Sequence, residues 1–249
     1  MPPQPISDPV HGDGPRERLA RVLRLTIPVA MAYLPLGVAF GVYLVSSGIA
    51  WYWAPLSAMI IFAGSIEFLA VSFIVAGLPL AVVAWTTFVV NFRHIFYGLS
   101  FPIGRLRTLP QKLYGVYALT DETYGITAAG DGRRLDGTGI TLLQLVSHFW
   151  WILGAALGAG LGAIIPPHIG GFEFALTAMF LILAVDAVRH SRDLRLLVYA
   201  AAACAAGFAA ERLVAENAFL IAGLIVYLGL VSVDYVRSPR AREEAHHAG

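Results

Sequence analysis

Long apolar stretches, separated by short polar or charged connections, recur along almost the whole chain. They comprise residues 25–47, 54–76, 78–101, 114–130, 139–165, 173–188, 195–214 and 217–236. A transmembrane helix needs about 20 predominantly apolar residues, whereas the strands of a membrane barrel give alternating segments of about ten. The pattern therefore predicts an all-α integral membrane protein, a polytopic helical bundle whose membrane domain covers residues 25–236.

The composition supports this class and argues against others. Hydrophobic residues make up 58% of the chain and charged residues only 13%, against about 25% in soluble domains. The net charge of +1 gives no reason to expect nucleic acid as a partner. Cys204 is the single cysteine, which excludes an internal disulfide and a cysteine metal site, and we expect no cofactor and no metal. Residues 1–24 predict a disordered, basic tail rather than a removable signal peptide, and 237–249 predict a cytoplasmic C-terminal tail.

The positions of the basic residues predict the topology. Apart from Arg93 and Arg212, the 17 basic residues lie in the two tails or between stretches three and four, four and five, and six and seven. The connections 48–53, 77–78 and 166–172 carry no Lys or Arg. Cytoplasmic connections are enriched in Lys and Arg, so we place the basic segments and both termini inside. This placement predicts about six crossings, with 54–76 and 114–130 as re-entrant or broken helices.

Both proposed re-entrant segments carry polar residues at their centres. The first contains Ser65 and Glu67, and the second contains a polar run, Thr120, Asp121, Glu122, Thr123 and Tyr124. Broken helices at membrane depth are tolerated where they are buried in protein or face a wet cavity, and transporters use them to build substrate sites. Ser65–Phe68 and Asp121–Tyr124 share a polar-x-polar-aromatic outline, which suggests an internal repeat.

The stretch 78–101 contains Asn91, Arg93, His94 and Tyr97 on one broad face of a helix. A charge in lipid costs about 2.5–3.5 kcal/mol, so Arg93 requires a partner or an exit to water. One interpretation has Arg93 and His94 extending to the headgroups near a helix end. The other pairs Arg93 with Glu67, Asp121 or Glu122 in a sheltered pocket, where His94 can change charge. The acidic residues also have a structural interpretation, as a solvated loop or a protonated core residue.

Two further features have simpler interpretations. Gly154, Gly158 and Gly162 follow one another at every fourth position and predict a helix face that another helix can approach closely. Ser147 and His148 are adjacent, so they face different directions on a helix and form no local catalytic pair. We interpret His148 as a core or interface histidine.

Several runs resemble the AzlC family, the large subunit of the branched-chain amino acid exporters called LIV-E. They are PVAMAYLPLGVAFG from Pro28, FAGSIEF at 62–68, NFRHIFYG at 91–98, DETY at 121–124 and FALTAMF at 174–180. The resemblance implies export of valine, leucine, isoleucine and similar amino acids such as methionine. It also implies a small hydrophobic partner subunit of the AzlD type. The position of Glu67 departs from the family pattern, in which glutamine is common, and the resemblance assigns no residue roles.

The sequence thus predicts a non-enzymatic exporter in the plasma (inner) membrane, driven by the proton motive force. The substrate pocket is expected between the two broken segments and the third stretch. The substrate ammonium would meet Glu67, Asp121 or Glu122, or the carbonyl end of a half-helix. Its carboxylate would meet Arg93, Ser65 or the N-terminus of a half-helix. An intramembrane enzyme using Ser147, His148 or His94 is one alternative, without a recognised nucleophile motif to support it. A non-transporting assembly or sensor subunit is the other.

Overall fold

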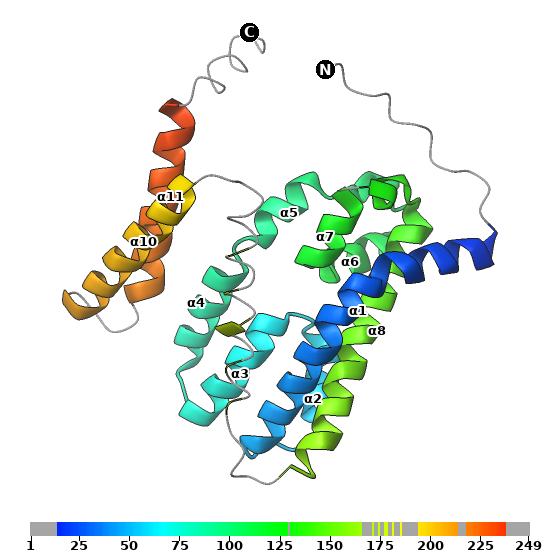
Figure 1. The fold of residues 1–249 in the computed structure, drawn as a ribbon, viewed down its shortest axis with the longest axis horizontal. Helices are drawn as coiled ribbons and strands as arrows, with labels where there is room; N and C mark the ends of the chain where they lie inside the picture. Colours follow the sequence, from blue (N-terminus) through cyan, green and yellow to red (C-terminus); the bar gives the residue numbers. More distant parts are fainter. Residues whose placement is uncertain are drawn as a thin grey trace. The chain divides into compact units, whose positions relative to one another are not determined.

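The computed structural model describes residues 14–128, 130–165, 194–213 and 218–237, together with 171, 174, 177, 178, 181 and 185. The described elements are α1 (Pro15–Ser46), α2 (Trp53–Ile60), α3 (Gly64–Ala76), α4 (Leu80–Asn91), α5 (His94–Ser100), η1 (Ile103–Arg105), α6 (Leu109–Tyr117), α7 (Asp121–Ala128), η2 (Gly130–Arg134), α8 (Gly137–Gly162), α10 (Leu194–Leu213) and α11 (Ala218–Arg237). All of them are helices, as predicted (Figure 1). The chain divides into unit 1, residues 1–177, and unit 2, residues 178–249.

Helices of membrane-crossing length occur where the apolar stretches predict them. Among the described residues, α1, α8 and most of α10 are long and apolar enough to cross a membrane. Helices α4 and α5 together also qualify, with a bend of 43° between them. Helix α11 covers the last predicted stretch, whereas 173–188 lies largely outside the described residues. The chain is therefore a helical membrane protein, and the total of six crossings stays a prediction.

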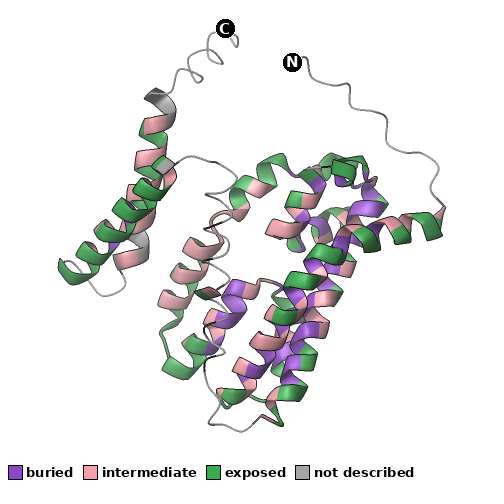
Figure 2. Cartoon of the chain, in the orientation of Figure 1, coloured by how far each residue is buried: buried purple, intermediate pink, exposed green. Residues whose placement is uncertain are grey.

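Helices α1 and α8 run side by side in the same direction along one flank of unit 1 (Figure 1). A Cβ atom added to Gly37 would lie 2.9 Å from the backbone nitrogen of Ala155, and one added to Gly158 would overlap the backbone of Val38. Such spacing requires glycine at both positions, because any side chain would push the backbones apart. The glycine pattern of α8 is thus explained by close packing against α1. Buried residues concentrate on these facing sides and on α3 (Figure 2).

The two segments predicted to be re-entrant or broken are both broken helices. Three residues separate α2 from α3, and three separate α6 from α7. The longest of the four helices, α3, has 13 residues and spans about 20 Å, which is too short for a 30 Å hydrocarbon core. At each break, a side chain from the first turn of the following helix accepts a hydrogen bond from a backbone N–H of the break. Glu67 Oε2 accepts from the backbone N–H of Ala63 (3.1 Å), and Thr123 Oγ1 accepts from that of Thr120 (3.0 Å).

Three basic segments of unit 1 meet at one end of it. Arg105, between α5 and α6, donates to the carbonyl oxygen of Arg133, between α7 and α8 (2.7 Å). Arg18, in the first turns of α1, forms an ion pair with Asp136, the N-cap residue of α8 (3.4 Å). The segment α6–α7 therefore begins and ends at the same end of unit 1. Because α1 leaves that end and α5 returns to it, α2–α3 lies between two connections at the opposite end.

Unit 2 is described by α10 and α11, which pack against each other as a pair. Arg195, near the start of α10, forms an ion pair with Asp234, near the end of α11 (3.6 Å). A Cβ atom on Gly207 would lie 2.7 Å from the carbonyl oxygen of Phe219, so the two helices approach closely there.

Two substitutions in α8 test the packing of α1 against α8. Gly158→Ala places a methyl group against the backbone of Val38, and we expect it to destabilise the protein by about 1–3 kcal/mol. Gly160→Ala, two residues further on, meets nothing within 4 Å and should leave stability unchanged or slightly raised. Apparent melting temperatures in detergent measure both effects. Equal values for the two variants would contradict the close packing.

Candidate functional site

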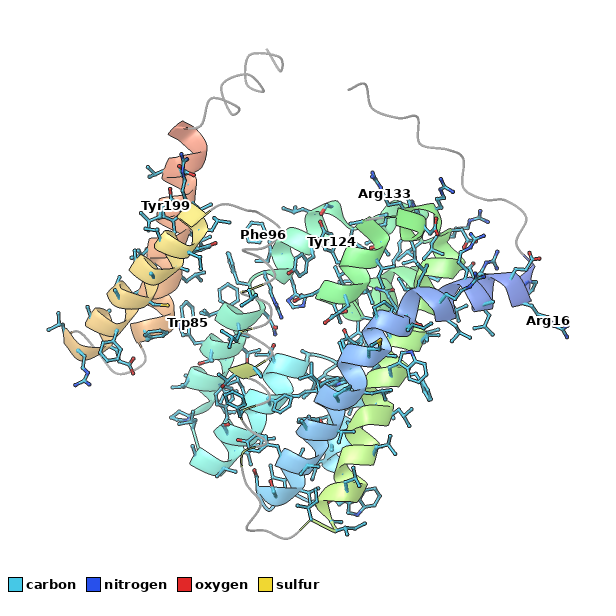
Figure 3. All side chains as sticks on the ribbon, viewed as in Figure 1. Arg16, Trp85, Phe96, Tyr124, Arg133 and Tyr199 are labelled. Carbon is cyan, nitrogen blue, oxygen red and sulfur yellow. The ribbon has the colours of Figure 1, made fainter. Side chains whose placement is uncertain are left out.

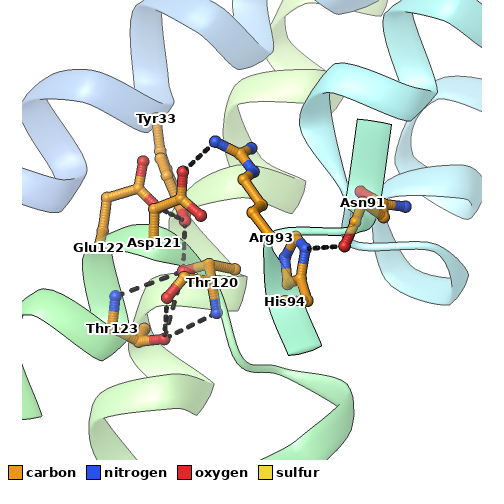
Figure 4. Close-up of polar contacts among 8 residues, drawn as sticks. All are labelled: Tyr33, Asn91, Arg93, His94, Thr120, Asp121, Glu122 and Thr123. Atoms are coloured by element: carbon orange, nitrogen blue, oxygen red, sulfur yellow. Dashed lines mark hydrogen bonds and ion pairs between the residues drawn. The ribbon is translucent and has the colours of Figure 1, made fainter. Parts of the chain in front are cut away.

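The bend between α4 and α5 presents a group of polar side chains inside the third apolar stretch. Helix α4 ends at Asn91 and α5 begins at His94, which leaves Arg93 next to the bend. The imidazole Nδ1 of His94 lies 3.1 Å from the carbonyl oxygen of Asn91, which the interrupted helix leaves free (Figure 4). The interruption thus exposes backbone and side-chain polar groups at a point where a regular helix would satisfy its own backbone.

Arg93 forms an ion pair with Asp121, the first residue of α7 (Figure 4). The side chains are partly buried, with 33% and 22% of their surface exposed. Asp121 also lies at a helix N-terminus, where the helix dipole favours a negative charge. Of the three candidate carboxylates, Asp121 is therefore the one that contacts Arg93. Arg93 Nε, Asp121 Oδ1 and Asn91 Oδ1 are buried without a hydrogen-bond partner among the described residues.

The break between α6 and α7 is also connected to α1. The hydroxyl of Tyr33, on α1, lies 2.7 Å from Oε2 of Glu122 and 2.9 Å from Oγ1 of Thr120 (Figure 4). Its single proton can be donated to only one of them at a time. Thr123 is fully buried and bonds both the backbone and the side chain of Thr120. These bonds fix the acidic start of α7 against α1.

Aromatic contacts join α5 to α7 beside the ion pair. The rings of Tyr97 and Tyr124 stack with centroids 4.8 Å apart, and the hydroxyl of Tyr124 lies 2.8 Å from Oγ of Ser100. His94 contacts the ring of Tyr97 edge to face at 5.6 Å. Eight of the ten predicted site residues thus lie in one group, which we call the polar cluster: Asn91, Arg93, His94, Tyr97, Asp121, Glu122, Thr123 and Tyr124.

Ser65 and Glu67 lie apart from the polar cluster in their contacts. Both are buried in the first turn of α3, with 5% and 1% of their surface exposed. Glu67 Oε2 accepts from the indole Nε1 of Trp151 (2.9 Å) and from the Ala63 backbone (3.1 Å). Among the described residues, neither Ser65 nor Glu67 makes a hydrogen bond or ion pair with a member of the polar cluster. The structure thus brings the predicted residues together in two places rather than in one chamber.

Two aromatic residues that the sequence analysis did not single out lie between these places. The rings of Tyr33 and Trp151 meet edge to face at 5.7 Å, so Tyr33 bonds Glu122 while Trp151 bonds Glu67. Their positions follow from the α1–α8 packing, which no local motif reveals. The only local signal for Tyr33 is that it is a polar-tipped residue in the otherwise apolar run between Pro28 and Pro35, and this signal is weak.

Phe62, in the first break, has an unusual backbone conformation. Its φ angle is +47°, and no other non-glycine residue in the described part of the chain has a positive φ. A bulky residue in this region is strained and persists only where its surroundings hold it. Here the Phe62 ring stacks on His148 at 4.1 Å and contacts Tyr33.

His148 has the surroundings of a packed core histidine. Its Nε2 lies 3.0 Å from the carbonyl oxygen of Ala58 and its Nδ1 lies 3.1 Å from the hydroxyl of Tyr114. The imidazole thus contacts α2 and α6, whereas the buried hydroxyl of Ser147 has no hydrogen-bond partner among the described residues. The two side chains do not form a catalytic pair. In the described part of the chain, His, Cys, Asp and Glu also form no group of three that could hold a metal ion.

Comparisons with known proteins identify relatives along most of the chain. The AzlC protein family model matches residues 28–165. The branched-chain amino acid transport protein AzlC of Bacillus subtilis is 28% identical over 88% of this chain and 85% of its own length. An uncharacterized membrane protein of Haemophilus influenzae is 31% identical over 71% of this chain and 73% of its own. The inner membrane protein YgaZ of Escherichia coli is 24% identical over 68% and 73%. No solved structure matches the chain.

The bond between Tyr33 and the start of α7 can be tested without a transport assay. Tyr33→Phe removes a buried hydroxyl and leaves Glu122 and Thr120 short of a partner, which should cost about 1–3 kcal/mol of stability. Tyr43→Phe, on the same helix, removes a hydroxyl that bonds Ser72 at an exposed site and should change stability by about 0.5 kcal/mol or less. Thermal unfolding of the two variants gives the comparison. If Tyr33→Phe had the same stability as the wild type, α1 would not hold α7 through this bond.

Proposed function

We propose that this chain, which belongs to the AzlC family, is a secondary transporter subunit that exports branched-chain amino acids across the inner membrane. Valine, leucine and isoleucine are the expected substrates, with methionine as a further apolar side chain. The name of the Bacillus subtilis relative, which specifies branched-chain amino acid transport, supports the substrate class. The name of the Escherichia coli relative supports an inner-membrane location.

The observation that carries the proposal is the ion pair between Arg93 and Asp121, because it joins two interrupted helices inside the membrane domain. An amino acid carries one charge of each sign. Its carboxylate can bind Arg93 and its ammonium can bind Asp121 or Glu122, so the substrate can replace the ion pair without leaving a buried charge alone. The unpartnered atoms of Arg93, Asp121 and Asn91 supply further hydrogen bonds. Substrate binding would thus separate the α4–α5 bend from α7.

The proton motive force is a sufficient energy source. One charge moved across 100 mV supplies about 2.3 kcal/mol, enough for roughly a 50-fold gradient of substrate. Exchange of one proton for one amino acid therefore meets the requirement of an exporter. His94 lies in the polar cluster beside the α4–α5 bend and is a candidate to carry that proton.

The proposed topology has six crossings, re-entrant segments at 54–76 and 114–130, and both termini in the cytoplasm. The contacts among the three basic segments of unit 1 support it, because they gather at one end. Tyr124 and Arg133 lie at that same end of unit 1 (Figure 3). At the other end of α1, the basic-free connection carries three exposed aromatic residues, Trp51, Tyr52 and Trp53, which suit a membrane interface.

We further propose that α2–α3 and α6–α7 are an internal repeat and that the transporter assembles with a small AzlD-type membrane subunit. The common feature of the two segments is a three-residue break closed from the next turn, by Glu67 in one and by Thr123 in the other. Two related broken segments entering from opposite sides are a recurrent arrangement in secondary transporters. The AzlD-type partner is expected from family membership.

The role of Arg93 is testable in proteoliposomes. Arg93→Ala should abolish leucine and valine export, because the substrate carboxylate loses its cation and Asp121 is left unpaired. The Arg93→Ala protein should still insert into the membrane. In a separate measurement, export by the wild type should stop when an uncoupler is added. Exchanging the charges, with Arg93→Asp combined with Asp121→Arg, should restore part of the transport, because the ion pair is re-formed in the opposite sense. Unchanged efflux in Arg93→Ala would remove Arg93 from the mechanism.

Cysteine labelling tests the topology. In a Cys204→Ala background, single cysteines at 102–112 and 131–138 should react only from the cytoplasmic side, and those at 48–53 only from the outside. This result follows from the contact of Arg105 with Arg133, which places both basic connections at one end. Labelling of 102–112 and 131–138 from opposite faces would make 114–130 a full crossing and exclude the proposed topology.

A further inference from the structure

A largely apolar cavity of about 420 Å³ lies between α1, α2 and α3. Buried side chains of Phe40, Leu44 and Val71 line it, whereas Ile60 and Ile74 are more than half exposed and lie at its rim. No member of the polar cluster lines this cavity. Sites for small molecules occupy about 300–1,000 Å³, so the cavity has room for one small ligand.

Glu67 gives this cavity its chemical character. Among the described residues that line it, Glu67 alone has an ionisable side chain, and only 1% of its surface is exposed. Two donors, the Trp151 indole and the Ala63 backbone, bond Oε2 and fix the carboxyl group. Oε1 is buried and has no hydrogen-bond partner among the described residues. Ser57 also lines the cavity, and its hydroxyl lies near the Glu67 carboxyl group. This hydroxyl donates its hydrogen bond to the carbonyl oxygen of Ala54 (3.0 Å).

The free oxygen and the apolar wall together specify one class of ligand. A buried acceptor without a partner is unfavourable, and a bond from a charged donor is among the strongest that can satisfy it. A primary ammonium group supplies both the positive charge and the donors. The wall is formed mainly by leucine, isoleucine, valine and phenylalanine, which suit a branched alkyl chain. The described residues that line the cavity include no Lys, Arg or His, so a carboxylate or phosphate on the ligand would find no cation among them.

We propose that this cavity binds a small primary alkylammonium ion, with its nitrogen on Glu67 Oε1 and its branched chain against Phe40, Leu44 and Val71. A branched-chain amino acid enters the same cavity with its carboxylate left toward the rim, and therefore binds less tightly than the amine that lacks the carboxylate. An amine-headed lipid is disfavoured, because its phosphate would lie beside the ammonium in a wall without cations. The site is distinct from the polar cluster and does not depend on the direction or energy source of transport.

Calorimetric titration of the purified full-length protein in detergent tests the site with three probes of equal alkyl shape. We expect 3-methylbutylamine to bind most tightly, leucine more weakly, and 4-methylpentanoate, which has no ammonium, not at all. Glu67→Gln should weaken amine binding by about tenfold or more, since the amide oxygen still accepts a hydrogen bond but no longer carries the negative charge that attracts the ammonium. Ala70→Phe, which fills the cavity and keeps Glu67, should also abolish binding.

Matched controls separate a specific site from general effects. Glu17→Gln removes the same charge from an exposed position on α1, roughly 35 Å along the helix from Phe40, and should leave the affinity within about twofold. Thermal unfolding shows whether each variant is folded, and either Glu67→Gln or Ala70→Phe suffices for the test. The proposal is overturned if amine binding is equal in wild type and folded variants, as partition into detergent or lipid would give, or if 4-methylpentanoate binds as well as the amine. Because the measurement is binding, a failure to export amino acids would contradict the proposed function and leave this result unaffected.

Discussion

The close approach of α1 and α8 sets the position of nearly everything else in unit 1. Glycines on both helices let the two backbones touch, and this contact fixes the level of Tyr33 on one helix and Trp151 on the other. Those two side chains hold the carboxyl groups of Glu122 and Glu67, one on each broken segment. A shift of one helical turn between α1 and α8 would separate both acids from their donors. The packing of glycine against backbone therefore also determines which donors the carboxyl groups of Glu122 and Glu67 meet.

A second constraint is the cost of polar groups in an apolar environment. Each interruption in a helix frees backbone groups that lipid cannot satisfy. In this chain the next turn supplies the missing partner, a carboxyl group in one segment and a hydroxyl in the other. Three acceptor atoms, Asn91 Oδ1, Asp121 Oδ1 and Glu67 Oε1, have no hydrogen-bond partner among the described residues. Polar groups that the fold leaves unsatisfied are natural positions for ligands.

The sequence predicted the helical membrane class, the AzlC family and the two broken segments, because length, hydropathy and short motifs are local properties. It also grouped the polar residues of 91–97 with those of 121–124, which the structure brings together. It did not choose among the three acidic partners of Arg93, since that choice depends on how α5 and α7 meet. The single pocket expected from the sequence placed Glu67 beside Arg93, whereas Glu67 accepts hydrogen bonds from Trp151 and Ala63 in the structure. Tyr33 and Trp151 have ordinary local surroundings, and only tertiary packing shows their contacts.

The strained backbone of Phe62 has a consequence for how the first broken segment moves. Its left-handed conformation is held by the rings that surround it, from α1, α6 and α8. If those rings withdraw, the residue relaxes to an ordinary backbone angle and releases about 1–3 kcal/mol, which would swing α3 relative to α2. The break between α2 and α3 thus stores backbone strain that the contacts of the Phe62 ring maintain. Motion of α1 or α8 would remove this constraint, so a rearrangement of α2–α3 would be coupled to the positions of these two helices.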